Sequence, residues 1–138
     1  MEKILVADDD AEIQDIVRTI LTREGYEVVS ARDGKEAIEL AKTTMPDLVI
    51  LDYLMPFLNG VEVCKKLKED DLTKSIPIVM ITAYPQEKEN GLSAGAMDFF
   101  TKPIEKVDLL LRVKSILKVR HISNELQKII GYMEELGK

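Results

Sequence analysis

Carboxylate side chains follow two apolar runs of the sequence. Asp8 and Asp9 come directly after the run 4–7, and Asp52 comes directly after the run 48–51. A continuous apolar run bounded by polar residues is typical of a strand that is buried on both faces in a parallel sheet. If the two strands lie side by side, the three carboxylates meet at one edge of the sheet. Because like charges repel at close range, this arrangement predicts a cation between them.

Two further polar side chains come at the ends of later apolar runs. Thr82 follows the run 76–81, and Lys102 lies just past the short run 97–100. In an open α/β sheet the functional site lies beyond the carboxyl ends of the strands, so both side chains are expected beside the carboxylates. Carboxylates with room for water suit Mg²⁺, and Lys102 and Thr82 can donate to phosphoryl oxygens. Asp52 is then a candidate nucleophile that forms an acyl phosphate.

The elements that position these residues alternate between strand and helix. Apolar residues at helical spacing, polar residues at helix starts, and Gly or Pro at helix ends predict a helix after each strand. Five such alternations imply an α/β fold, a doubly wound parallel sheet with helices on both faces. The predicted strands span residues 3–7, 26–30, 47–52, 76–81 and 97–100. The predicted helices begin near residues 10, 33, 60, 85 and 105, the fourth being weak and the fifth long.

Composition and charge narrow the class of protein. The chain has 138 residues, of which 46% are hydrophobic and 32% are charged, as in an ordinary globular domain. No stretch approaches the roughly 20 apolar residues that span a bilayer, so we expect a cytoplasmic protein without membrane insertion. The net charge of −6 argues against direct nucleic-acid binding. The single Cys64 excludes an internal disulfide.

In type, order and position, these residues resemble the active-site set of two-component response-regulator receiver domains. The resemblance runs from residue 3 to about residue 118. It implies a flavodoxin-like sheet with strand order 2-1-3-4-5, flanked by five helices of which the last is extended. The motifs that carry it are Asp8-Asp9, Asp52, Thr82-Ala83 and Lys102-Pro103.

The resemblance gives each of these residues a role. Asp52 would be the phosphoacceptor, and Thr82 and Lys102 would hold the phosphoryl oxygens. The peptide bond between Lys102 and Pro103 is expected to be cis. The implied Mg²⁺ ligands are Asp9, Asp52, the backbone carbonyl of Leu54 and, through water, Asp8.

The same resemblance implies a phosphorylation switch rather than an enzyme that acts on a separate substrate. A sensor histidine kinase would supply the phosphoryl group, which adds roughly −1.5 to −2 charge and three strong acceptors. Thr82 would move toward this group, and Phe99 would rotate inward to fill the vacated space. The surface of the fourth helix, the fifth strand and the fifth helix would change as a result.

Several positions depart from the pattern of the family. Leu54 and Tyr84 are bulky where the family tunes the lifetime of the phosphoryl group, so we expect slow autodephosphorylation. The span from Thr82 to Gly95 is short for the family, which predicts a shortened or displaced fourth helix. Phe57 lies where the family often has Gly.

The last residues of the chain form a heptad pattern. We therefore divide the chain into a receiver domain over residues 1–118 and a helical extension over residues 119–138. We expect the extension to continue the fifth helix and to form a parallel two-stranded coiled coil, which gives a homodimer. The alternative is an amphipathic helix that folds back on its own domain. The apolar positions of the pattern are Val119, Ile122, Leu126, Ile129, Met133 and Leu136.

Other interpretations stay open at this point. No output motif follows the extension, so the chain is expected to be either a stand-alone receiver or the front part of a longer protein. The pair Asp8 and Asp10 faintly resembles the nucleophile motif of haloacid-dehalogenase-type hydrolases, in which Asp8 instead of Asp52 would be phosphorylated. A flavodoxin-like cofactor binder is the third possibility, although no phosphate-binding loop rich in Ser, Thr and Gly follows the first strand.

Overall fold

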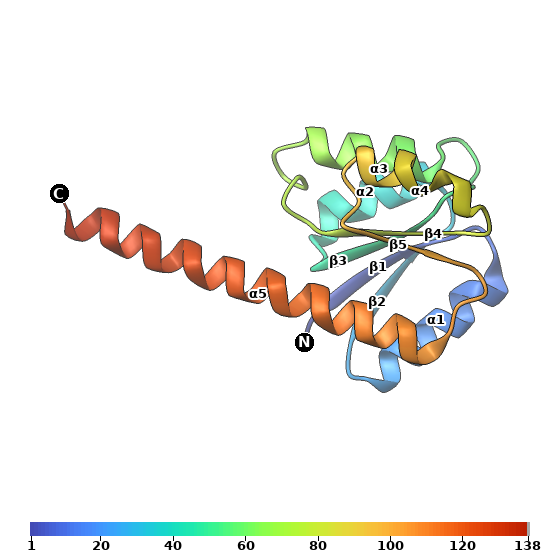
Figure 1. The fold of residues 1–138 in the computed structure, drawn as a ribbon, viewed down its shortest axis with the longest axis horizontal. Coiled ribbons are helices and arrows are strands. Elements are labelled where there is room, and N and C mark those ends of the chain that lie inside the picture. The colour runs from blue at the N-terminus through green and yellow to red at the C-terminus, as the bar shows by residue number, and fades with distance from the viewer. Residues whose placement is uncertain (138) are drawn as a thin grey trace.

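The computed structural model describes residues 1–137, in which five parallel strands form one sheet (Figure 1). The strand order is β2-β1-β3-β4-β5, as predicted. Neighbouring strands β1 and β3 run in register, with Ala7 beside Leu51. The residues that follow these two strands are therefore brought together at one edge. The strands are β1 (Lys3–Ala7), β2 (Glu27–Ala31), β3 (Leu48–Asp52), β4 (Ile78–Thr82) and β5 (Asp98–Thr101).

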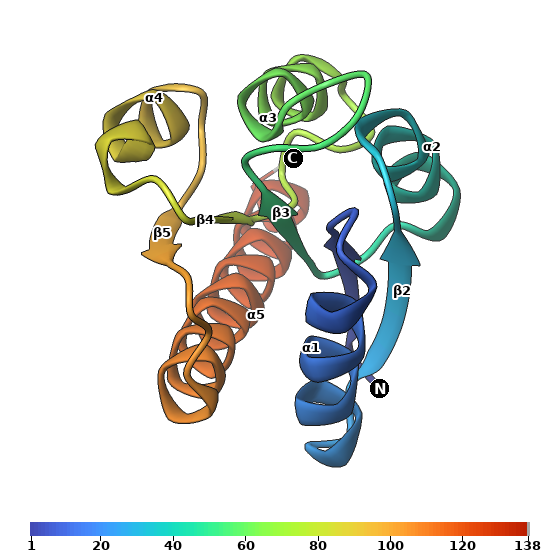
Figure 2. The ribbon, with the colours of Figure 1, turned by 90° about the vertical axis from the view of Figure 1, so that its right-hand side faces the viewer.

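The helices cover both faces of the sheet, as Figure 2 shows in an end-on view. On one face lie α1 (Ala11–Arg23) and α5 (Lys106–Leu136), and on the other lie α2 (Gly34–Thr44), α3 (Gly60–Glu69) and α4 (Lys88–Ser93). Because side chains alternate along a strand, each buried strand serves two cores. In β1, Leu5 and Ala7 pack toward α2 and α3, whereas Ile4 and Val6 pack toward α1 and α5.

Polar caps set the starts of the first three helices. The side chains of Asp10, Asp33 and Asn59 each accept a backbone N–H from the first turn of α1, α2 and α3. Such caps satisfy backbone donors that have no partner inside the helix. Because α1 is capped at Asp10, Asp8 and Asp9 stay in the turn between strand and helix, at the edge of the sheet.

Several strand boundaries differ from the prediction by one or two residues. The largest difference concerns β4, which was predicted over residues 76–81 and spans Ile78–Thr82. Pro77 accepts a hydrogen bond from the N–H of Val49 (3.0 Å) but has no N–H of its own, so the regular ladder begins one residue later. Thr82 is consequently the last residue of β4 and not the residue after it.

The fourth helix is short, as the sequence predicts. A 3₁₀ turn over Pro85–Glu87 leads into α4, which has only six residues. Gly91 lets this helix approach the sheet closely, because a Cβ atom there would lie 3.1 Å from the sulfur of Met80 and 3.3 Å from the ring of Phe99. The helix therefore rests on the Phe99 side chain.

Helix α5 is continuous for 31 residues and reaches well beyond the sheet (Figure 1). Its buried residues end at Leu117, and the side chain of Arg120 makes the next contact by donating to the carbonyl of Ser75 (2.8 Å). Residues 121–137 are all exposed. The interpretation in which the extension folds back on its own domain is therefore wrong. Lys138, the last residue of the predicted extension, lies outside the described residues.

Length alone does not make α5 a membrane helix. Among residues 1–137 there is no helix that combines the length and the apolar character needed to cross a bilayer.

Candidate functional site

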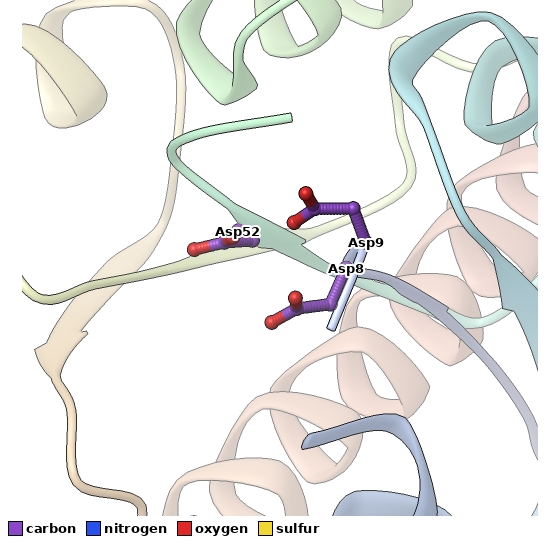
Figure 3. Close-up of side chains that lie close together, drawn as sticks. All are labelled: Asp8, Asp9 and Asp52. Atoms are coloured by element: carbon purple, nitrogen blue, oxygen red, sulfur yellow. The ribbon is translucent and has the colours of Figure 1, made fainter. Parts of the chain in front are cut away.

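Three carboxylates meet at the edge where β1 and β3 end (Figure 3). One carboxylate oxygen from each of Asp8, Asp9 and Asp52 lies within 4.8 Å of the other two. Asp8 and Asp52 are buried, with 2% and 7% of their surface exposed, whereas Asp9 is open to solvent. The carboxylate cluster predicted from the two apolar runs is therefore present in the fold.

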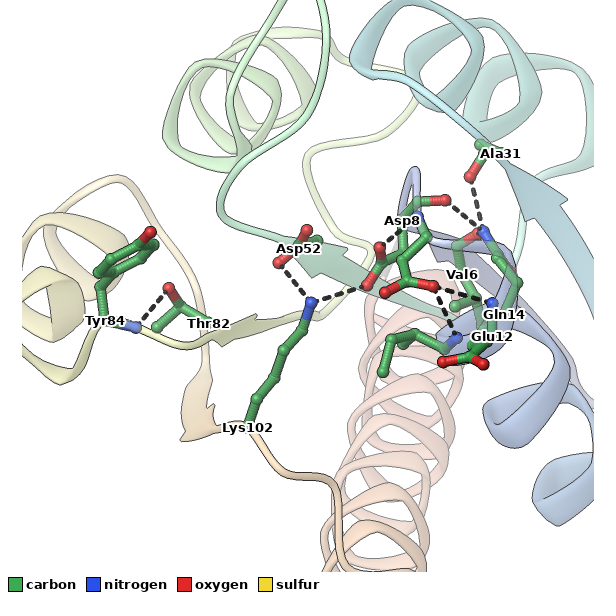
Figure 4. Close-up of polar contacts among 11 residues, drawn as sticks. Val6, Asp8, Glu12, Gln14, Ala31, Asp52, Thr82, Tyr84 and Lys102 are labelled. Atoms are coloured by element: carbon green, nitrogen blue, oxygen red, sulfur yellow. Dashed lines mark hydrogen bonds and ion pairs between the residues drawn. The ribbon is translucent and has the colours of Figure 1, made fainter.

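Lys102 bridges the two buried carboxylates (Figure 4). Its Nζ atom lies 3.2 Å from Oδ2 of Asp8 and 3.3 Å from Oδ1 of Asp52. Its backbone N–H donates to the carbonyl of Thr82 (2.8 Å), and its peptide bond to Pro103 is cis, as expected. Lys102 is thus paired with two of the three carboxylates, which leaves the cluster with an excess of negative charge.

The burial of this excess charge changes the proton affinity of the cluster. Burial, reinforced by repulsion from Asp8, raises the pKa of Asp52 to about 6 although Lys102 opposes the shift. Burial also raises the pKa of Asp8 against the opposing N–H of Asp10 and the charge of Lys102. A second cation at this edge would relieve both carboxylates.

The donor set of the cluster fits a hard divalent cation. Carboxylate oxygens line a cavity of about 320 Å³ that also contains Leu54 and Lys102. Mg²⁺ takes oxygen ligands and keeps several of its waters, so an open cavity with two or three carboxylates suits it better than a closed protein cage. This chemistry agrees with the metal site that the resemblance implies.

The two residues predicted to act as a switch come from neighbouring strands, since Thr82 ends β4 and Phe99 lies on β5. Thr82 is buried and lines the same cavity as Asp52. Its hydroxyl oxygen accepts the backbone N–H of Tyr84 (3.0 Å; Figure 4). Phe99 does not line this cavity, because its ring is already turned inward and is only 7% exposed beneath α4.

Gln14 supports the turn that carries Asp8 and Asp9, a role that was not predicted from the sequence. Its side-chain amide, which is buried, donates to the carbonyls of Val6 (3.0 Å), Asp8 (3.0 Å) and Ala31 (2.7 Å) (Figure 4). Gln14 thereby ties the end of β1 and the Asp8 backbone to the end of β2. A signal was available, because Gln14 precedes Val17 by three residues and so lies on the buried stripe of α1.

Comparisons with known proteins agree with this geometry. The model of the family described as response regulator receiver domain matches residues 4–114. The sequence is 44% identical over 124 residues to the alkaline phosphatase synthesis transcriptional regulatory protein PhoP of Bacillus subtilis. This alignment covers 88% of this chain and 51% of that protein. It is 41% identical over 128 residues to the response regulator PleD of Caulobacter vibrioides. This second alignment covers 91% of this chain and 28% of that protein.

A solved structure shows the same fold. The response regulator receiver domain protein (CheY-like) from Methanospirillum hungatei matches with a TM-score of 0.84 and 30% identity, over 89% of this chain and 98% of that chain. The chain spans about half of PhoP and less than a third of PleD. The similarity to these two regulators therefore covers one part of each.

Proposed function

The chain belongs to the family of response regulator receiver domains, and on that premise we propose that it is a switch whose phosphoacceptor is Asp52. A sensor histidine kinase donates the phosphoryl group, and the product is an acyl phosphate on the Asp52 carboxylate. The protein acts as a signalling switch and not as an enzyme with turnover on a separate substrate. The observation that carries the proposal is the buried Asp52 carboxylate, paired with Lys102 at the end of β3.

The contacts of Asp8 favour Asp52 over Asp8 as the nucleophile. Oδ1 of Asp8 accepts the backbone N–H of Asp10 (2.9 Å), and its Oδ2 is paired with Lys102. Both oxygens of Asp8 are thus engaged in holding the turn and the lysine. The hydrolase interpretation needs Asp8 to attack, which would break these contacts.

We assign the Mg²⁺ site to the same edge of the sheet. The bound ion would neutralise the charge that accumulates when a phosphoryl group approaches the carboxylates. Lys102 supports the fit, since its ammonium already bridges Asp8 and Asp52 and can turn to a phosphoryl oxygen. The proposed ligands are Asp9, Asp52, the backbone carbonyl of Leu54 and, through water, Asp8.

The switch couples Thr82 to Phe99. Phosphorylation draws the Thr82 hydroxyl away from the N–H of Tyr84 and toward the phosphoryl group. Since Phe99 packs directly under Gly91, any change in its packing is transmitted to α4. Moving the switch from 1:99 to 99:1 requires a differential free energy of about 5.5 kcal/mol, which a few charge-assisted hydrogen bonds can supply.

The extension of α5 is proposed to form a homodimer. Its apolar heptad positions, which include Leu126 and Ile129, are exposed along a helix that projects from the domain. We also propose that the protein is cytoplasmic and that it does not bind nucleic acid directly.

Intact mass spectrometry tests the proposed phosphoacceptor. The protein is incubated with Mg²⁺ and acetyl phosphate as wild type, Asp52→Asn and Asp8→Asn, after circular dichroism has shown that all three are folded. We expect one added phosphate on wild type, none on Asp52→Asn, and slower but detectable labelling of Asp8→Asn. Labelling that survives in Asp52→Asn and disappears in Asp8→Asn would overturn the proposal in favour of the hydrolase.

A further inference from the structure

The extension of α5 presents an apolar stripe that nothing in the described chain covers. We call this stripe the seam; exposure of its members lies between 49% and 85%. In heptad notation the members alternate between a and d positions. The a positions of the seam are Val119, Leu126 and Met133, and the d positions are Ile122, Ile129 and Leu136.

We infer that the seam is covered by the seam of a second copy that runs in the opposite direction, and not parallel to it as the heptad pattern alone led us to expect. The inference rests on the homodimer proposed above and specifies its geometry. In the antiparallel register every a residue lies opposite a d residue, so all six positions are used. The resulting layers are Val119 with Leu136, Ile122 with Met133, and Leu126 with Ile129, each formed twice.

The side chains of the seam favour this direction. In a parallel pair each layer holds two identical residues, and Leu126 at an a position between Ile122 and Ile129 at d positions shifts parallel coiled coils toward three or four strands. In the antiparallel pair each layer combines one β-branched residue with one that is not branched at Cβ. Such mixed layers let a stiff side chain pack against a more adaptable one.

The residues that flank the seam point to the same direction. In a parallel pair g positions face e positions, which would place the carboxylate of Glu125 against the apolar side chain of Ile130. In an antiparallel pair g positions face g positions, so Glu125 lies beside Tyr132 of the second copy, whose hydroxyl can donate to it. Ile130, now 53% exposed, then packs beside Ser123 of the second copy.

The charges along α5 are also complementary in this arrangement. The part that leaves the domain is basic, since it carries Lys118 and Arg120, while the distal part carries an excess of glutamates that includes Glu134. A parallel pair places like charges side by side, whereas an antiparallel pair places the acidic end of each helix beside the basic part of the other. Opposed helix dipoles add to this preference.

The receiver domain offers a matching surface where the distal end of the second helix would arrive. A cavity of about 420 Å³ lies between α5 and the domain, and Val119 belongs both to this cavity and to the seam. Its lining includes Met97, which is 54% exposed, and the cations of Lys68 and Arg120. Leu136 of the second copy meets Val119 at the rim of this cavity.

Disulfide trapping tests the direction of the two helices in the full chain. Cysteine replaces either Ile122 or Met133, and each variant is oxidised in a glutathione buffer alone and after the two have been mixed and allowed to exchange. These positions are opposite each other in the antiparallel pair, but each is about 16 Å along the axis from its own copy. The chain's own Cys64 should not interfere, because it is buried and its pKa is raised to about 11, so that little thiolate forms. The unsubstituted chain serves as the blank.

We expect the mixture to form a covalent dimer at least fivefold faster than either variant alone. His121→Cys mixed with Met133→Cys is the matched control, because position 121 points away from the seam. Trapping of each variant with itself would show a parallel pair and overturn the inference while leaving the homodimer in place. A monomer by light scattering at all concentrations would overturn the inference and the homodimer together, whereas the phosphorylation of Asp52, followed by mass, reports separately on the proposed switch.

Discussion

The Nζ atom of Lys102 lies 3.3 Å from Oδ1 of Asp52, and yet the pKa of this carboxyl is raised to about 6. Burial and the nearby carboxylate of Asp8 outweigh the lysine. The same balance acts on the lysine, whose burial opposes its charge while the two carboxylates raise its pKa. The site is therefore held in a state of excess negative charge, which a cation or a phosphoryl group would change.

The rate of phosphorylation should depend on pH near the pKa of Asp52. Only the ionised carboxylate attacks phosphorus, so at limiting Mg²⁺ the initial rate with acetyl phosphate should fall as the pH drops below about 6. Saturating Mg²⁺ should move this decrease to lower pH, because the cation stabilises the carboxylate. Rates are measured by intact mass between pH 5 and 8, and a rate that is independent of pH at limiting Mg²⁺ would contradict the assigned pKa.

Removal of the Asp52 charge should stabilise the fold. Since the pKa rises from 3.8 to about 6 on folding, ionised Asp52 lowers the free energy of unfolding above pH 6, and this cost disappears as the pH falls below 3.8. Asp52→Asn should therefore gain roughly 1–2 kcal/mol at pH 7.5 without Mg²⁺, after allowance for screening by water. Urea unfolding measures the gain, and the exposed Asp15→Asn should show none. If Asp52→Asn gained the same free energy of unfolding at pH 4, the gain would not come from removal of the Asp52 charge.

Gln14 should act on both stability and metal binding. Gln14→Met keeps the length of the side chain but removes the donor that holds the carbonyls of Val6, Asp8 and Ala31. We expect a loss of about 1–3 kcal/mol in the free energy of unfolding and weaker Mg²⁺ binding, because the Asp8 turn loses its support. Urea unfolding and titration calorimetry measure the two effects. The exposed Gln127→Met is the control, and an unchanged Mg²⁺ affinity would reduce Gln14 to a purely structural role.

Phe57 adopts a backbone conformation that favours glycine. Its φ angle is +72°, its side chain is 71% exposed, and its ring lies 4.8 Å from Nζ of Lys35. Left-handed backbone costs a non-glycine residue about 1–2 kcal/mol, which offsets the cation–π contact of roughly 0.5–1 kcal/mol. Phe57→Gly should thus be at least as stable as wild type in thermal unfolding, and Phe57→Ala should be less stable than both. A Phe57→Gly variant that is less stable than wild type would mean that the ring contact dominates, whereas Phe57→Ala above Phe57→Gly would contradict the backbone argument.

The sequence allowed the fold and the acidic edge to be predicted, because both follow from local patterns. Buried runs such as 48–51 mark central strands, and a carboxylate at the end of each run has only one edge on which to lie. The partners of Gln14 could not be predicted, since they come from β1 and β2 together. The hydrogen bond from Arg120 to the carbonyl of Ser75 could not be predicted either, because it depends on where α5 leaves the domain.

The lifetime of the acyl phosphate should be limited by two side chains at the mouth of the site. Leu54 and Tyr84 line the cavity that holds Asp52 and are 50% and 44% exposed, so they cover part of the path by which water reaches the phosphorus. Leu54→Ala and Tyr84→Ala should each accelerate autodephosphorylation several-fold, and the double variant should be faster than either. Loss of the added phosphate is followed by intact mass after the donor has been removed. Leu72→Ala, which truncates an exposed leucine between α3 and β4, should leave the rate unchanged. A wild-type lifetime of only seconds in Mg²⁺ would show that neither side chain protects the phosphoryl group.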